Sequence, residues 1–362
     1  MRTAGGTRAA APSRSPARMS WKRWLLTGVS FAAAIGVSLY IVLTSWPAQR
    51  APVALPLSAH LAATAVLLLE VLTRGLKIRL SAASLRVPLS FAASVRTILA
   101  GDFGAGITPS RSGAEPARYL VLKEAGVPVA GALLVLFAEL FLEMLSLLII
   151  AVALWVGLEE GGAALGGLLG LVGGYSAFVL AVGAVGVALA RRNAAGPPPA
   201  WARRLGLNET RWRTVQRSMH HLRVSVEAVR DAHLGLMLVS LAASVVHVAL
   251  RLTLLPVLVW SLDRSVPLAP LLLWPLALFY GSVVVPTPAG GGVVEVAFKA
   301  TLGGTIPPAI FATTLIWWRV YSFYAYLVLG AVAAGDTALR ALRDDPEKPR
   351  RPRVWRRKRR GA

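Results

Sequence analysis

The sequence contains no cysteine among its 362 residues. Disulfide bonds, cysteine-ligated metals, thiol catalysis and S-palmitoylation are therefore excluded. Acidic residues are scarce as well, because 17 Asp and Glu stand against 39 Lys and Arg and give a formal net charge of +22. Nucleotide-binding and metal-ligand motifs are also missing, so the sequence predicts no cofactor, no metal site and no ATP hydrolysis by this chain.

Long apolar segments dominate what is present, with 56% of the residues hydrophobic. About 20 apolar residues cross a bilayer core of about 30 Å as a helix. The pattern predicts an all-α polytopic membrane protein with six full spans and two broken, re-entrant helical hairpins, about eight membrane segments in all. The predicted full spans are 24–46, 57–73, 128–157, 163–190, 234–261 and 309–335, and the broken segments are 88–124 and 266–304.

The two broken segments share one plan. The first contains Gly106-Ile-Thr-Pro-Ser-Arg-Ser-Gly-Ala-Glu115, and the second contains Val285-Pro-Thr-Pro-Ala-Gly-Gly-Gly-Val-Val-Glu295. Each has a Thr-Pro, a glycine-containing gap and a Glu that opens a new apolar helix, and both proline and glycine interrupt helices. In lipid, such a break is tolerated only where the freed backbone groups are buried in protein or line a wet cavity. Matched breaks in two halves of a membrane protein predict a transporter binding site.

The basic residues gather in segments that the predicted spans place on one side. Thirty of the 39 Lys and Arg lie before residue 24, at 74–86, at 191–230 and after residue 335. The positive-inside rule therefore predicts a multi-pass membrane protein with both termini in the cytoplasm. Because topology accounts for the charge, and no nucleic-acid-binding module accompanies it, no nucleic-acid partner is expected.

With these sides assigned, the segments read as span, span, broken hairpin, span, and then the same order inverted. This order predicts an inverted-topology repeat, although two short complete spans in place of each hairpin would keep the inversion. The inside loop also contains an arginine-rich amphipathic pattern at 208–231, typical of a helix at the membrane surface. The predicted domains are a basic tail 1–23, a first repeat 24–157, a second repeat 158–335 with the cytoplasmic loop 191–233, and a basic tail 336–362.

Ionisable groups inside membrane segments are costly and indicate function by default. Glu115 with Arg118, and Glu295 with Lys299, have the spacing of intrahelical ion pairs. A helix that starts after a break presents free N–H groups and a partial positive charge, which favours an anion, and glycine lets a phosphate approach the backbone. The predicted substrate-binding residues are Arg111, Gly113, Glu115, Arg118, Gly290, Gly291, Gly292, Glu295 and Arg319, with possible support from Arg96, Glu139, Glu143, His247 and Arg251; no catalytic residue is predicted.

Several of these residues also have a structural interpretation. Arg118 has the length to snorkel to the membrane surface. Glu139 and Glu143 are alternatively structural partners of Arg96 or Arg111. Hydrogen bonding within the bundle explains His247 equally well, and the glycine triplet also suits close helix packing.

At these residues the chain resembles the flippase-like transmembrane domain of lysylphosphatidylglycerol synthases and its stand-alone relatives, over about 24–335. The resemblance rests on the stretches Thr108–Arg118, Ala138–Glu143 and Pro286–Glu295 and on Arg319. Leu140 departs from it, since the family often has Arg there. No acyltransferase-like domain follows the last span, so the resemblance does not imply aminoacyl-lipid synthesis.

The resemblance implies a flippase-like protein of the bacterial or archaeal cell (inner) membrane that translocates or presents a phosphate-bearing lipid. The expected partners are membrane lipids, either an anionic phospholipid or a polyprenyl-phosphate lipid. Two alternatives remain: a membrane-embedded lipid-modifying enzyme that uses paired carboxylates, and an accessory subunit whose partner is a membrane glycosyltransferase.

Overall fold

The computed structural model describes residues 53–108, 110–158, 162–191, 232–284 and 290–343, together with positions 36, 39, 40, 43, 44 and 212. Within these residues the protein is helical and contains no β-strand. In this described part of the chain, three helices are long and apolar enough to cross a membrane: Val129–Gly157, Leu234–Trp260 and Pro308–Ala334. The predicted all-α class is confirmed. The predicted span 24–46 and loop helix 208–231 lie outside the described residues apart from those single positions, as do the basic tail 1–23 and residues 344–362 of the second basic tail. Residues 336–343 of that tail belong to the last helix.

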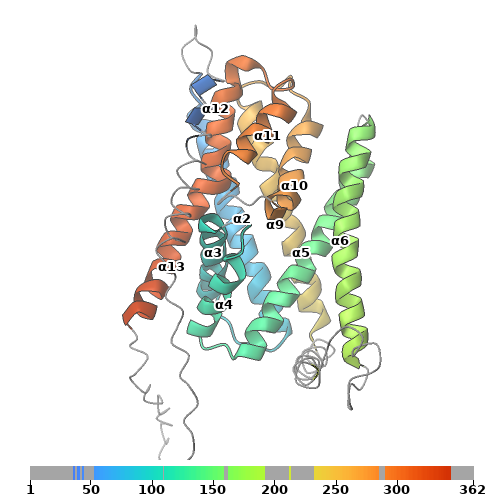
Figure 1. The fold of residues 1–362 in the computed structure, drawn as a ribbon, viewed down its shortest axis with the longest axis vertical. Coiled ribbons are helices and arrows are strands. Elements are labelled where there is room, and N and C mark those ends of the chain that lie inside the picture. The colour runs from blue at the N-terminus through green and yellow to red at the C-terminus, as the bar shows by residue number, and fades with distance from the viewer. Residues whose placement is uncertain are drawn as a thin grey trace, which may run out of the picture.

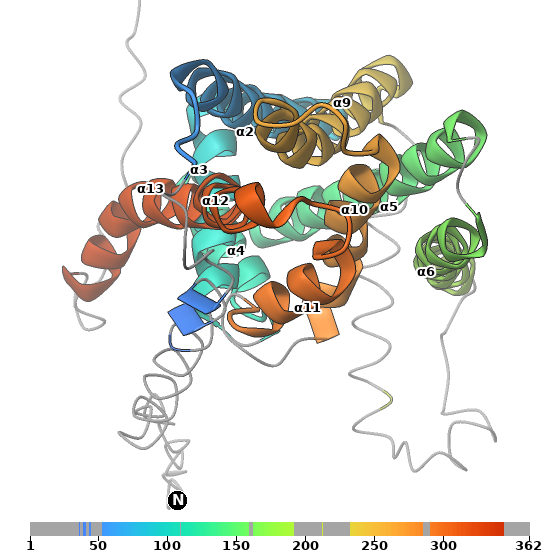
Figure 2. The same ribbon diagram turned by 90° about the horizontal axis from the view of Figure 1, so that it is seen from above.

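In chain order the helices are α2 (Leu57–Ser84), α3 (Phe91–Ile107), α4 (Ala114–Glu124), α5 (Val129–Gly157), α6 (Gly162–Arg191), α9 (Leu234–Trp260), α10 (Leu268–Val284), α11 (Val293–Leu302), α12 (Pro308–Arg319), the π-helix η1 (Val320–Tyr324) and α13 (Ala325–Arg343). Helices α2 and α9 pack along each other, as Figure 2 shows from above. The short pair α3–α4 lies in the lower half of Figure 1, and α10–α11 lie in the upper half. Helix α6 stands at the edge of the bundle, against α5.

Helix α2 departs most from the predicted spans. It has 28 residues and is therefore about 42 Å long at 1.5 Å per residue. The sequence pattern ended this span at residue 73 and assigned Arg74 and Lys77 to a cytoplasmic loop. That assignment is wrong, because both residues lie within the helix with exposed fractions of 5% and 0%. A hydropathy scale counts every charged residue as unfavourable within a span, so it ended the span before Arg74. In the structure, Asp102 of α3 neutralises Arg74 and Glu143 of α5 neutralises Lys77.

The break between α3 and α4 is a tight backbone turn. The hydroxyl of Thr108 accepts a hydrogen bond from the Gly113 N–H at 2.8 Å and donates to the Gly104 carbonyl at 2.6 Å. Ser110 and Arg111 have left-handed φ values of +51° and +57°. A Cβ at Gly104 would overlap the Gly113 carbonyl oxygen, so the two helices meet at backbone contact. The predicted break is therefore a turn after which α4 packs back against α3.

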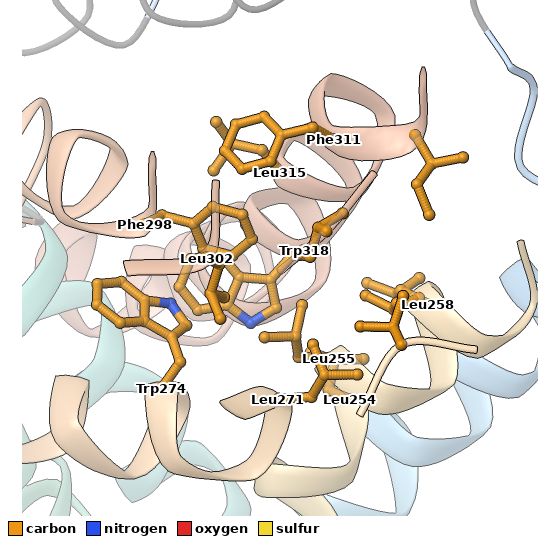
Figure 3. Close-up of a cluster of buried hydrophobic side chains, with 14 of the residues drawn as sticks. Leu254, Leu255, Leu258, Leu271, Trp274, Phe298, Leu302, Phe311, Leu315 and Trp318 are labelled. Atoms are coloured by element: carbon orange, nitrogen blue, oxygen red, sulfur yellow. The ribbon is translucent and has the colours of Figure 1, made fainter. Parts of the chain in front are cut away.

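The helix that follows the second break packs into an aromatic core. Helix α11 begins at Val293, after Gly290 and Gly292 with φ values of +65° and +79°. The Phe298 ring stacks on Trp318 of α12 with centroids 5.2 Å apart, and it meets Trp274 of α10 edge-on at 5.8 Å, as Figure 3 shows. Burial of these rings fixes α11 against α10 and α12.

The last long helix changes its hydrogen-bonding pattern directly after Arg319. Residues Val320–Tyr324 form the π-helix η1, and α13 follows without a break. In this widened turn, the Tyr321 hydroxyl lies 2.9 Å from Nδ1 of His60 on α2. Short π-helical turns within α-helices occur often at functional sites. The position of η1 therefore indicates a candidate functional region around Arg319.

Candidate functional site

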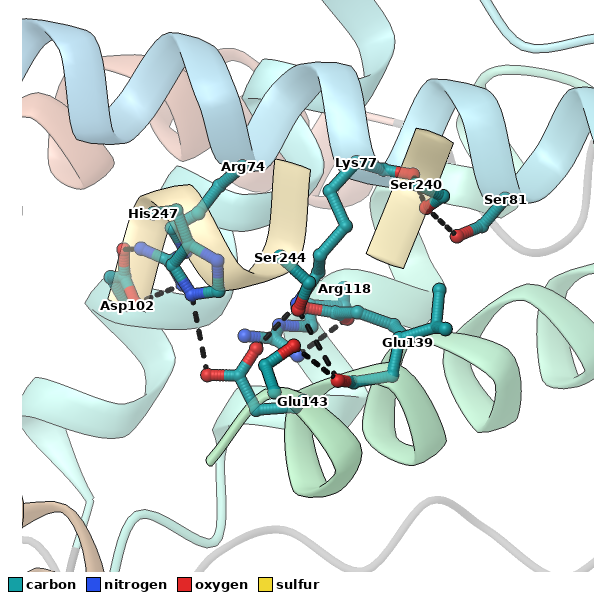
Figure 4. Close-up of polar contacts among 12 residues, drawn as sticks. Arg74, Lys77, Ser81, Asp102, Arg118, Glu139, Glu143, Ser240, Ser244 and His247 are labelled. Atoms are coloured by element: carbon teal, nitrogen blue, oxygen red, sulfur yellow. Dashed lines mark hydrogen bonds and ion pairs between the residues drawn. The ribbon is translucent and has the colours of Figure 1, made fainter. Parts of the chain in front are cut away.

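A buried lysine joins α2 to α5. The Lys77 ammonium forms an ion pair with Glu143 and lies 3.7 Å from a carboxylate oxygen of Glu139. Glu139 in turn accepts a hydrogen bond from Arg118 of α4 at 2.8 Å, and Figure 4 shows these groups converging. A buried cation is tolerated in an apolar bundle only when it is paired, and two carboxylates serve that purpose here. Together with Glu115, these residues form the Lys77 cluster.

Arg118 and Glu115 form the predicted i,i+3 pair, with 3.2 Å between their charged groups. The Arg118 side chain crosses α3 at Gly101, where a Cβ would overlap the guanidinium group. Arg118 is thus held inside the Lys77 cluster rather than extended away from it. Glu115 behaves differently, because 61% of its side chain is exposed.

His247 of α9 lies beside the Lys77 cluster. It is buried, and its Nε2 lies 3.3 Å from Oε1 of Glu143. Neither ring nitrogen has a hydrogen-bond partner of good geometry among the described residues. The Ser240 hydroxyl donates to the Lys77 carbonyl at 2.8 Å and holds α9 against α2. In the described part of the chain, no group of three or more His, Asp or Glu side chains is arranged to hold a metal ion.

A second group surrounds Arg74 on the same side of α2. Arg74 donates two hydrogen bonds to Asp102 of α3, at 2.7 and 3.1 Å, and lies 3.6 Å from Glu70. Glu70 accepts from the Tyr326 hydroxyl at 2.8 Å and lies 3.9 Å from Arg251. These four charged residues form the Arg74 group, with two anions and two cations.

The sequence analysis missed three members of these networks as site residues: Glu70, Arg74 and Lys77. Their spacing contains the signal, since they recur at steps of four and three on α2 and lie on one helix face with Ser81. A charged stripe along one face of an apolar helix indicates partners on neighbouring helices. The sequence analysis also missed Asp102 of α3 as a site residue, because its partner Arg74 was assigned to a loop.

Arg111 lies at the tip of the α3–α4 hairpin and has no carboxylate within ion-pair distance among the described residues. Electrostatic interactions join Arg111 to the cations Arg251, Arg118 and Arg74 and to the carboxylates of Asp102 and Glu115. Each of those three cations has a carboxylate partner of its own, so Arg111 is the guanidinium at the hairpin tip that lacks one among the described residues. Such a site favours an anion, and guanidinium binds phosphate well because it donates two parallel hydrogen bonds.

At the second break, Glu295 and Arg319 form a buried ion pair at 2.8 Å. The other carboxylate oxygen of Glu295 accepts the Gly292 N–H at 2.8 Å and so caps α11. The Arg319 guanidinium lies 4.8 Å from the centroid of the Phe323 ring. The intrahelical ion pair between Glu295 and Lys299 that the sequence spacing suggested does not form, because Glu295 faces α12 and Lys299 is exposed.

The structure thus distributes the predicted site residues over separate groups. The end of α3 approaches the Arg319 region through Gly106, where a Cβ would lie 3.4 Å from the Phe323 ring. Arg111 and Arg118 belong to the lower hairpin, whereas Glu295 caps the upper one. Arg96 lies apart, where it donates to Thr337 at 2.8 Å and pairs with Glu124 at 3.3 Å.

Apolar helices of membrane length around buried ion pairs define a polytopic integral membrane protein. The family model of the lysylphosphatidylglycerol synthase TM region matches residues 29–330, so the chain belongs to this family. The resemblance inferred from the sequence is thereby confirmed. The chain matches none of the curated proteins and none of the solved structures compared with it.

Proposed function

We propose that the protein is a flippase-like transporter that moves or presents a phosphate-bearing lipid, with Arg111 as the phosphate-binding residue. The observation that carries the proposal is the Arg111 guanidinium at the tip of a broken hairpin, which has no carboxylate within ion-pair distance among the described residues. Ionised side chains in membrane segments pair with one another unless they line a pathway for a polar substrate. A lipid phosphate is the anion that a membrane supplies at this position.

Glu115 extends the proposed site toward lipids with a cationic group. Its side chain is largely exposed, and it lies four residues after Arg111, in the first turn of α4. A headgroup that carries both a phosphate and an ammonium would therefore find complementary charges on one hairpin. Glu295 is less suited to this role, because both of its oxygens already have partners in the protein.

The broken hairpins support a proposed mechanism of alternating access. We place eight membrane segments in an inverted repeat, since α3–α4 and α10–α11 lie in opposite halves of the bundle (Figure 1). Helix α4 has 11 residues and α11 has 10, about half of the roughly 20 that a full span requires. Movement of one hairpin relative to the other would then expose Arg111 to either side of the membrane in turn.

The proposal places the α4–α5 turn in the cytoplasm of a bacterial or archaeal cell and the α9–α10 turn outside. In the outer turn, the hydroxyl and the backbone N–H of Ser265 donate to Asp263 and hold the pKa of its carboxyl below the ordinary value. Because the chain has no cysteine, single cysteines report sidedness directly. We expect Arg264→Cys to react with an impermeant maleimide in intact cells and Ala125→Cys to react only after permeabilisation. The reverse labelling would exclude this topology.

The phosphate-binding role is tested by Arg111→Gln with Arg86→Gln as the matched control. Both arginines have a left-handed φ of +57°, so the two variants change backbone strain alike. A charge-assisted hydrogen bond contributes about 1.5–3 kcal/mol, which predicts a roughly 10- to 150-fold loss of affinity for a short-chain phosphatidylglycerol. Calorimetric titration measures this affinity, and translocation of a fluorescent phosphatidylglycerol in proteoliposomes should slow in parallel. Equal behaviour of the two variants would refute the assignment.

A further inference from the structure

A groove lies between the first turns of α2 and the last turn of α9. Its volume is about 640 Å³, and its apolar floor consists of Ala59, Ala62 and Val257. Ligand pockets in proteins commonly measure about 300–1,000 Å³. Ala59 also packs into the apolar core that contains Phe298 of α11, so the groove belongs to the upper half of the bundle in Figure 1. It therefore lies apart from Arg111 on the α3–α4 hairpin.

Polar side chains gather at the outer end of this α2–α9 groove. They are Ser58 of α2, Ser261 at the end of α9 and Arg264 in the following turn. The Ser261 hydroxyl donates to a backbone carbonyl of α9 at 2.7 Å, and its oxygen can still accept a hydrogen bond. Arg264 forms no ion pair with a carboxylate among the described residues, and the neighbouring Asp263 accepts two hydrogen bonds from Ser265. The groove thus has a basic mouth above an apolar floor.

The length of α9 places the mouth of the groove at the level of lipid headgroups. Helix α9 has 27 residues and is about 40 Å long, whereas the hydrocarbon core of a bilayer is about 30 Å thick. Trp260 in its last turn donates its indole N–H to the Val266 carbonyl at 2.9 Å, and tryptophan is enriched at membrane–water interfaces. Helix α2 begins beside this turn without an acidic residue in its first turn and without a side-chain cap. The partial positive charge of its N-terminus adds to that of Arg264.

We propose that the α2–α9 groove binds one anionic phospholipid, with its phosphate on Arg264 and an acyl chain along Ala59, Ala62 and Val257. Guanidinium donates two parallel hydrogen bonds to a phosphate, and the two serine hydroxyls face the position of the glycerol ester groups. A soluble anion would match the basic mouth but leave the apolar floor uncovered, whereas a lipid matches both. The site is independent of Arg111, so it stands whether or not that residue binds a headgroup.

Quenching by brominated lipids tests whether a phospholipid occupies the groove. Because the chain has no cysteine, Leu61→Cys, at an exposed position beside Ala62, takes a single bimane label. The labelled full-length protein is reconstituted in phosphatidylcholine vesicles with increasing fractions of chain-brominated phosphatidylglycerol or phosphatidylcholine. We expect stronger quenching by the phosphatidylglycerol at equal fraction, and Arg264→Gln should reduce this preference roughly tenfold because the charge-assisted hydrogen bonds to the phosphate are lost. Equal quenching by the two lipids in the unsubstituted groove would overturn the proposal.

Two further variants separate the site from general lipid contact. Arg79→Gln is the matched control for charge, since Arg79 is also exposed on α2 but lies about 30 Å along the helix from Ser58. It should keep the preference for phosphatidylglycerol, and a loss equal to that of Arg264→Gln would show a general charge effect instead. Ala62→Leu fills the floor of the groove while Arg264 stays intact, so it should reduce quenching by the brominated chain. Unchanged quenching in Ala62→Leu would exclude an acyl chain in the groove.

The last comparison distinguishes a lipid from a free anion and this site from Arg111. Inorganic phosphate added to the vesicles should leave the quenching unchanged, because it has no chain to cover the apolar floor. Relief as large as that caused by Arg264→Gln, with chloride at equal ionic strength giving none, would identify a site for free phosphate and overturn the lipid site. Arg111→Gln should keep the preference for phosphatidylglycerol at this label even if it abolishes translocation. Loss of the preference in Arg111→Gln would contradict a separate site.

Discussion

Replacement of Arg319 by Gln is expected to destabilise the protein by about 3–5 kcal/mol, because removal of one partner leaves a buried and uncompensated charge. The Arg319 guanidinium is the ion-pair partner of Glu295 and stacks over Phe323, while Glu295 caps the start of α11. The variant should therefore loosen the upper hairpin and the aromatic core beneath it. The temperature at which the purified protein unfolds in detergent measures the effect.

The double variant Glu295→Gln with Arg319→Gln distinguishes an ion pair from simple packing. Removal of both charges avoids the orphaned carboxylate, so the double variant should recover a large part of the stability that Arg319→Gln loses. Arg264→Gln serves as the control, since Arg264 is exposed in the α9–α10 turn and surface changes there stay within about 0.5 kcal/mol. Additive losses in the double variant would show that the pairing contributes little.

Lys77→Met should have an effect of similar size, about 3–5 kcal/mol of lost stability. Methionine fills much of the volume of lysine but leaves Glu143 without its nearest cation, whereas Glu139 keeps Arg118. Because Lys77 ties α2 to α5, the loss should reduce the yield of folded protein after extraction as well as its unfolding temperature. Lys299→Met is the matched control, because Lys299 is exposed on α11.

A second substitution identifies the physical cause. Glu143→Gln in the Lys77→Met background removes the orphaned charge and should restore stability toward that of the wild type. If the double variant were no more stable than Lys77→Met alone, lost packing rather than lost charge balance would explain the defect. The same pair of variants also tests whether α2 is buried at Lys77, as the structure shows.

The sequence by itself determined the elements of this fold and the places where they break. Apolar runs predicted α5, α6, α9 and the start of the last long helix within a few residues, although that helix runs on to Arg343, because burial in lipid requires about 20 apolar residues for each crossing. Thr108 and Gly113 marked the turn of the first hairpin, since proline and glycine interrupt helices whatever surrounds them. The i,i+3 pair of Glu115 and Arg118 was also predictable, because both residues lie on one helix.

Only the tertiary structure decided which charges are partners. Lys77 and Glu143 are 66 residues apart in sequence, and the hydropathy of α2 alone places the lysine in a loop. Glu295 has a possible partner on its own helix in Lys299, yet it pairs with Arg319 because α12 packs against its face. A charge in an apolar segment signals that a partner must exist, since the cost of burial demands one. Which partner that is depends on how the helices pack, and no local pattern encodes that geometry.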